Sequence, residues 1–308
     1  DIGHGTRLAG IIGGRGINPD LKGAAPDCQF VIVKLSRATK VELDAAVIDK
    51  TDVPSYTPWS ALLALRYIIA VARELKRPVV VFEPLGSNMG SHTGNGIVER
   101  SINNYSIQSG TVVVVPTGNQ GNTDTHTEGI IESSGDIKDI EIRVGEKQKN
   151  LPIEIWVNKP NKVKLSIVSP SGEVIDNLEA KNTNNERIKF LYEGTEMVVN
   201  FTSPELSTGD SLIFIRAYNL KAGIWKFRLT GQSIVDGKYY AWIPQRELLD
   251  SETKFLNSVG YTTLTLSSTS SGAISVAYYN QDDNSVISES GRGYTRYGMI
   301  KPDIAAGG

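Results

Sequence analysis

His4 lies between two glycines and is followed by small and apolar residues up to Ile12. This pattern is typical of a helix start with close backbone packing. An imidazole in that position can accept a proton from a nucleophile, although a structural histidine in a tight turn fits the same local pattern. The glycines form no nucleotide-binding fingerprint, because no glycine follows Gly5 after three residues and no lysine follows as in a phosphate loop.

Asn119 is a second candidate for chemistry. It follows the apolar run Val112–Val115 in the segment Pro116-Thr117-Gly118-Asn119-Gln120-Gly121. The carboxyl ends of parallel strands are where such sheets bind ligands. There an amide could donate a hydrogen bond to negative charge developing on a carbonyl oxygen. Ordinary turn chemistry is the alternative interpretation of this asparagine.

Three further segments combine glycine and proline with polar neighbours. Lys22-Gly23-Ala24-Ala25-Pro26 precedes an apolar run, Pro84-Leu85-Gly86-Ser87 follows a second one, and residues 301–308 read Lys-Pro-Asp-Ile-Ala-Ala-Gly-Gly. Each of them alone is compatible with a structural turn.

Alternating strands and helices are expected to position these segments. Short β-branched runs predict buried strands at residues 29–35, 79–82 and 111–115. A broad apolar stripe predicts a helix over residues 59–76, and residues 95–109 suit another. This alternation predicts an α/β domain with a parallel sheet that has helices on both faces.

The pattern changes near residue 133. Short alternating runs separated by turn residues predict an inserted antiparallel β-sandwich or jelly roll over residues 133–244. Residues 1–132 and 245–308 are then two parts of one α/β domain, the second with a strand at residues 273–279. The aromatic cluster Tyr239-Tyr240-Ala241-Trp242 leaves open a separate carbohydrate- or protein-binding role for the insertion, against packing within the protein.

In this order the segments resemble the subtilase family of serine peptidases. His4 matches the histidine of the H-G-T-x-x-A-G motif, residues 22–26 match the G-x-A-P turn, and Leu85-Gly86 matches the S-L-G stretch. Asn119 matches the asparagine of A-G-N-x-G, and residues 301–308 match K-P-D-x-x-A-P-G. The resemblance implies a subtilisin-like fold.

More specifically, the segment from Gly86 to Gly94 resembles a stretch of the clostridial germination subtilases of the Csp type. Those proteins carry a jelly-roll insertion between the oxyanion asparagine and the serine, and here 189 residues separate Asn119 from Gly308. The resemblance implies a bacterial spore or cell-envelope setting and a proenzyme as the protein substrate.

The family implies a role for each matched residue. His4 would be the general base, Asn119 the oxyanion donor, and Pro84, Leu85, Gly86 and Gly118 the backbone that binds an extended substrate. Two positions depart from the family pattern, since Pro84 replaces a serine and Gly307 a proline. Pro84 lacks an N–H but keeps its carbonyl acceptor.

We expect the chain to be an excerpt that begins after the catalytic aspartate and ends before the serine. Asp1 is interpreted as a surface or capping carboxylate. The excerpt alone is then expected to be inactive and unstable, with Val112–Val115 exposed, unless the remainder of the parent chain or a swapped copy completes it. A catalytically dead subtilase acting as a binding or regulatory protein is the alternative function.

Composition adds few constraints. The net charge of −2 and the absence of a long apolar run predict neither a nucleic-acid nor a membrane partner. Cys28, the sole cysteine, is interpreted as a small buried residue. No cofactor is predicted: His92 and His126 with Asp124 and Glu128 lack a usual metal-ligand pattern, and calcium in the loop with Asn18 and Asp20 is an unsupported alternative.

Overall fold

The computed structural model of the chain describes residues 3–179 and 185–308. The chain divides into two compact units. Unit 1 comprises Asp1–Ala38 and Pro54–Lys76, and unit 2 comprises Thr39–Val53 and Arg77–Gly308. Within the described residues, no helix combines the length and the apolar character that crossing a bilayer requires.

A parallel sheet forms the α/β part of unit 2. Three of its strands lie where the sequence predicts them, two of these at apolar β-branched runs, and those predictions are confirmed. Such runs suit strands that are covered on both faces, because branched side chains pack well on a pleated surface. In order across the sheet, the strands are β1 (Val79–Phe82), β2 (Thr111–Pro116), β14 (Ala273–Tyr279) and β15 (Ile304–Gly307).

The burial of β2 corrects one expectation. Val113 and Val115 are fully buried rather than exposed, while Val112 remains 40% exposed. β2 lies inside the sheet, between β1 and β14, and its successive side chains point to opposite faces, of which the one with Val113 and Val115 is buried.

Helix α4 (Ile97–Ser106) lies within the range predicted for it and packs against β2 and β14. Unit 2 also contains the short helix α2 (Lys40–Ala45) and the 3-10 helices η2 (Arg246–Leu248) and η3 (Ser267–Thr269). Thr39 and Glu42 start α2 with a capping box, in which each side chain accepts a hydrogen bond from the other residue's backbone N–H.

Unit 1 contains α1 (His4–Gly13), the 3-10 helix η1 (Pro19–Leu21) and α3 (Pro58–Glu74). The predicted helix over residues 59–76 is therefore confirmed as α3. The Thr57 hydroxyl caps its start by accepting the N–H of Ser60 at 3.3 Å. Leu65, Ile69 and Ala72 recur at helical spacing and are the buried residues of the apolar stripe.

Residues 29–35 correct a prediction, because they form no strand. Phe30 is 44% exposed and Ile32 is 69% exposed. A β-branched run becomes a strand only when a neighbouring strand takes up its backbone hydrogen bonds, and this segment belongs to no β-ladder among the described residues. Cys28, beside it, is half-buried rather than buried.

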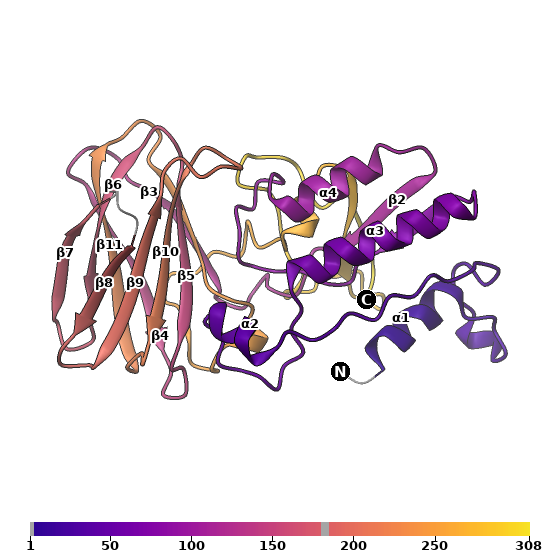
Figure 1. Ribbon diagram of the computed structural model, residues 1–308, viewed down its shortest axis with the longest axis horizontal. Coiled ribbons are helices and arrows are strands. Elements are labelled where there is room, and N and C mark those ends of the chain that lie inside the picture. The colour runs from indigo at the N-terminus through magenta and orange to yellow at the C-terminus, as the bar shows by residue number, and fades with distance from the viewer. Residues whose placement is uncertain (1–2, 180–184) are drawn as a thin grey trace. The chain divides into compact units, whose positions relative to one another are not determined.

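Two antiparallel sheets make up the remainder of unit 2 and face one another, apart from the parallel sheet (Figure 1). One sheet has the order β3 (His126–Ile130), β12 (Lys238–Trp242), β5 (Leu151–Val157), β10 (Ser211–Tyr218), β9 (Thr195–Thr202) and β8 (Asn185–Phe190). The other has the order β13 (Lys254–Phe255), β4 (Ile137–Val144), β11 (Gly223–Ser233), β6 (Lys162–Val168) and β7 (Val174–Leu178).

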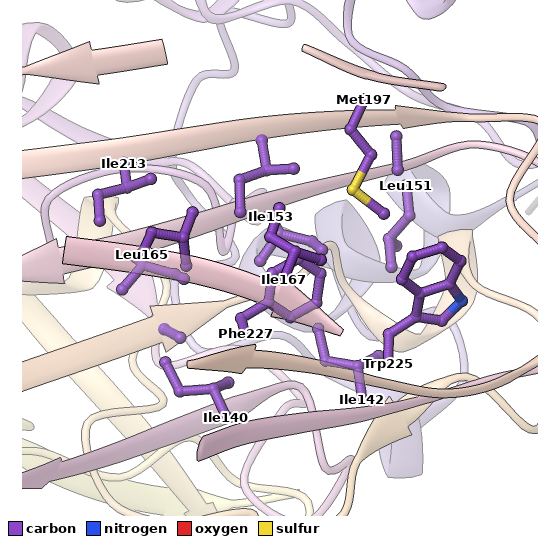
Figure 2. Packing of buried hydrophobic residues seen from close by; sticks show 14 of the residues in the cluster. Ile140, Ile142, Leu151, Ile153, Leu165, Ile167, Met197, Ile213, Trp225 and Phe227 are labelled. Atoms are coloured by element: carbon purple, nitrogen blue, oxygen red, sulfur yellow. The ribbon is translucent and has the colours of Figure 1, made fainter. Parts of the chain in front are cut away.

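Alternate apolar side chains of the two sheets meet in one core. Figure 2 shows Ile153 and Met197 of the first sheet with Ile142 and Trp225 of the second, and all four are at most 1% exposed. Phe190 packs edge-on against Trp225, with ring centroids 4.9 Å apart. Each such side chain contributes roughly 1.5–3 kcal/mol when fully buried. The alternating runs of the sequence therefore form the sandwich that they predict.

The sandwich recruits strands from outside residues 133–244. β3 pairs with β12, and β13 pairs with β4. The predicted domain boundaries and the jelly-roll topology stay predictions. Tyr239, Tyr240 and Trp242 are at most 9% exposed. The aromatic cluster therefore packs within the protein and does not form an exposed binding surface.

Candidate active site

His4 is the first residue of α1, at the helix start that the sequence predicts. Gly3 precedes it in the left-handed region, with φ 95°, which glycine adopts without steric cost. The Gly3 carbonyl accepts the N–H of Arg7 at 2.9 Å, so the helix begins directly at the histidine. The His4 side chain is exposed. Asp1 lies outside the described residues.

The turn at residues 22–26 packs against the other end of α1. The N–H groups of Ala24 and Ala25 donate to the carbonyls of Ile11 and Ile12 at 3.0 and 2.7 Å. A Cβ atom at Gly23 would lie 2.5 Å from the backbone nitrogen of Gly14, so glycine is required for this approach. Two motifs of the sequence thus form one local structure in unit 1.

In unit 2, the segments that follow β1 and β2 converge on Thr265. A Cβ atom at Gly86 would lie 2.4 Å from Cβ of Thr265, and one at Gly118 would lie 2.3 Å from its Cγ2. Thr265 is fixed between them, since its N–H donates to the Thr117 carbonyl at 3.0 Å and its hydroxyl to the Pro116 carbonyl at 3.1 Å. The structure therefore brings together the backbone segments that the family resemblance assigns to substrate binding.

Asn119 is exposed just beyond the carboxyl end of β2. Its Oδ1 accepts a hydrogen bond from the Tyr278 hydroxyl, on β14, at 3.1 Å. Burial raises the pKa of Tyr278, so the phenol stays protonated and able to donate. Because Oδ1 is engaged, the amide presents Nδ2, its donor, to a ligand. This is the orientation that an oxyanion donor needs.

Pro84 and Leu85 lie between the end of β1 and Gly86. The Pro84 carbonyl accepts no hydrogen bond from the described part of the chain, so it remains an available acceptor. Glu83, just before it, is a feature that the sequence pattern did not indicate. Burial raises the pKa of its carboxyl to about 7, despite a hydrogen bond from Ser267.

The loop at residues 87–94 is held by the sandwich. The Asn88 amide donates to the Thr125 hydroxyl at 3.1 Å. The Gly90 N–H donates to the Glu154 carboxylate, on β5, at 2.8 Å. Burial raises the pKa of Glu154 to about 7. The segment that follows the proposed substrate backbone is therefore fixed by Glu154 of the sandwich and by Thr125, just before β3.

His92 and His126 stack on the same indole. Their ring centroids lie 4.0 and 4.3 Å from that of Trp242. His126 also contacts Glu128, with 3.2 Å between Nε2 and Oε2. Burial, together with the nearby His126 and Arg296, lowers the pKa of His92 to about 3.

Metal-ligand groups of three or more such side chains do not occur among residues 3–179 and 185–308. In the loop considered for calcium, Asn18 Oδ1 accepts the N–H of Asp20 at 3.2 Å and so caps η1.

The chain is similar in structure to the CspB protease of Clostridium perfringens. The similarity has a TM-score of 0.86 with 27% sequence identity, and it covers 100% of this chain and 62% of the CspB chain. The chain thus spans less than two thirds of the length of CspB. No protein-family model and no curated protein matches the chain.

A parallel sheet joined to two antiparallel sheets is consistent with a subtilase-like fold that has an inserted β domain. The roles assigned to His4, Asn119, Gly86 and Gly118 remain predictions.

Sequence reasoning missed the residues that support these segments. Thr265 lies 149 residues after Pro116, whose carbonyl it contacts, and Tyr278 lies 159 residues after Asn119, whose side chain it contacts. The run Thr262–Ser270 resembles an exposed polar loop, yet most of its residues are buried. Its hydroxyl groups donate to backbone carbonyls, as with Thr265 and the carbonyl of Pro116, at the end of β2, at 3.1 Å. A polar run directly before an apolar strand was the available signal.

Proposed function

We propose that the protein is a subtilisin-like serine endopeptidase that hydrolyses peptide bonds in a protein substrate. The observation that carries this proposal is the structural likeness to the CspB protease over 100% of the chain. The order of the subtilase motifs along the sequence supports it independently. The narrower resemblance to germination subtilases extends the proposal to a spore protease that processes a proenzyme.

In this mechanism His4 moves the protons. It accepts the proton of the serine hydroxyl while that oxygen attacks the carbonyl carbon of the scissile bond. It then gives the proton to the leaving amine, and a second cycle with water hydrolyses the acyl-enzyme. The serine and the aspartate that orients His4 would come from the remainder of the protein or from a swapped copy.

Asn119 would act when the carbonyl oxygen becomes negatively charged. Its Nδ2 donates to that oxygen, while Tyr278 holds the other end of the amide. Removing a donor of this kind costs about 3–4 kcal/mol of transition-state stabilisation. The substrate would bind as an extended strand along residues 84–86 and beside Gly118.

The test uses the full-length protein with a peptide substrate and a fluorophosphonate probe, which labels activated serines. We expect His4→Ala to abolish both hydrolysis and labelling. Ile11→Ala is the matched control, since Ile11 is a 69% exposed residue of the same helix. Near-normal turnover by His4→Ala would contradict the role of His4. A wild-type protein that neither cleaves nor labels would instead be the catalytically dead alternative.

A further inference from the structure

The Gly86 carbonyl, proposed to pair with substrate, is already engaged. It accepts a hydrogen bond from Nε2 of Gln245 at 2.7 Å, although the two residues are 159 positions apart. Gly86 is exposed, so the bond lies where a ligand could replace it. The Pro84 carbonyl, two residues earlier, accepts no such bond among the described residues.

Gln245 belongs to a segment, residues 244–249, that follows β12 and precedes β13, two strands of the sandwich, and that we name the strap. The Arg246 N–H donates to Oε1 of Gln120 at 2.9 Å, and Nε2 of Gln120 donates to Glu247 at 3.1 Å. Gln120 is buried and follows Asn119 directly. The strap is therefore anchored beside the site by bonds that do not involve the Gln245 side chain.

Two more hydrogen bonds hold the strap. Lys50 Nζ donates to the Glu247 carbonyl at 3.1 Å, and the Arg246 guanidinium donates to the Thr253 carbonyl at 2.7 Å. Because the backbone of the strap is fixed, the Gln245 amide can leave Gly86 by rotating its side chain alone. The Gln245 amide thus competes with a ligand for the Gly86 carbonyl, and the strap does not depend on this bond to keep its position.

The geometry of strand pairing makes the competition at Gly86 depend on the length of the substrate. In an extended pairing, alternate residues direct their hydrogen-bonding groups to the same partner, so Pro84 and Gly86 would face one substrate strand about 7 Å apart. A substrate with one peptide N–H can use the open Pro84 carbonyl. A longer substrate reaches Gly86 as well, and must displace Gln245 there.

We propose that Gln245 is a specificity-determining residue, which disfavours extended substrates by occupying the Gly86 carbonyl. This inference rests on the proposed endopeptidase function. When a substrate N–H displaces Gln245 from the Gly86 carbonyl, one hydrogen bond replaces another and substrate binding gains little. When the Gln245 amide is absent, the same N–H makes a new hydrogen bond and binding gains its full net value. Removing the Gln245 amide should therefore favour long over short substrates by roughly 2- to 10-fold.

The experiment measures kcat/KM of the full-length protein for two anilides that end in the same residue, one an acetylated single residue and one an acetylated tetrapeptide. We expect Gln245→Ala and Gln245→Glu to raise the ratio of kcat/KM, tetrapeptide over single residue, by roughly 2- to 10-fold, through KM. The glutamate variant keeps the size of the side chain but cannot donate when ionised. Gln232→Ala is the matched control, since Gln232 is an exposed glutamine of β11 whose amide contacts Glu179, and it should leave the ratio unchanged.

The outcomes separate this inference from the proposed function. A ratio that is unchanged or lowered in both Gln245 variants, while both substrates are still cleaved, overturns the role of Gln245 and leaves the endopeptidase intact. A wild-type protein that cleaves neither substrate and takes up no fluorophosphonate overturns the proposed function, and this inference with it. Circular dichroism of Gln245→Ala and Gln245→Glu shows whether each variant is folded. Because the two replacements differ in size, a defect specific to one of them is distinguished from the loss of the amide, which both share.

Discussion

Replacing Gly118 by alanine places a methyl group against Thr265, and replacing Gly86 does so from a second segment. The two overlaps involve different atoms. At Gly118 the new Cβ would lie 2.3 Å from Cγ2 but 3.6 Å from Cβ of Thr265, whereas at Gly86 it would lie 2.4 Å from both atoms. Changing Thr265 to serine removes Cγ2 and retains Cβ. It should therefore relieve the first overlap and not the second.

The magnitudes follow from two effects. An overpacked methyl group costs about 1–3 kcal/mol of unfolding free energy. Gly118 adds backbone strain, since an alanine at its φ of 85° costs about 1–2 kcal/mol. Gly118→Ala should thus destabilise the protein by about 2–5 kcal/mol, and by only about 1–2 kcal/mol when Thr265 is already serine. Gly86→Ala should cost the same about 1–3 kcal/mol in either background.

Two double-mutant cycles, measured by urea unfolding of the full-length protein, test this reasoning. The expected coupling with Thr265→Ser is about 1–3 kcal/mol for Gly118→Ala and near zero for Gly86→Ala. Both cycles use the same Thr265→Ser variant. Its serine hydroxyl can keep the hydrogen bond to the Pro116 carbonyl, so loss of that bond does not contribute to either coupling. Equal coupling in the two cycles, or none in either, would refute the proposed convergence on Thr265.

Two further predictions concern Asn119 and His92. Tyr278→Phe removes the bond to Asn119 Oδ1 and should lower kcat of the full-length protein roughly 3- to 10-fold with KM unchanged; an equal rise in KM would show a binding role instead. The folded-state pKa of His92 is about 3, below its ordinary value, so its contribution to stability is present above about pH 6.5 and is lost as the pH falls toward 3. The stability gap between wild type and His92→Asn, a residue that tolerates the φ of 51°, should therefore narrow by about 2 kcal/mol between pH 6.5 and 5 in urea unfolding. A gap that does not vary with pH would contradict the depressed pKa.

Strands of the parallel sheet could be predicted where pattern and pairing agree. The runs that became β1 and β2 are short, β-branched and bounded by turn residues, and each has a parallel neighbour. Residues 29–35 have the same composition but belong to no ladder among the described residues. Periodicity therefore predicts which segments can be strands, and partners elsewhere in the protein decide which of them are.

Motif order in the sequence pointed to Asn119, Gly86 and Gly118, because such positions require particular residue types at fixed places. The sequence contained no comparable signal for Tyr278 or Gln245. A tyrosine and a glutamine occur in many surroundings, and these two matter only because the topology returns them to the strand ends. The supporting residues of a site are thus less predictable than its central ones.

The stack of His92, Trp242 and His126 makes one indole an optical reporter. An imidazole stacked on an indole is part of the ring's immediate surroundings, on which its fluorescence depends, and Trp242 has two imidazoles at about 4 Å. One of these, His92, belongs to the loop after Gly86, while Trp242 ends β12 of the sandwich. The emission of Trp242 therefore senses whether that loop and the sandwich remain in contact, and its lifetime would register their separation without any added label.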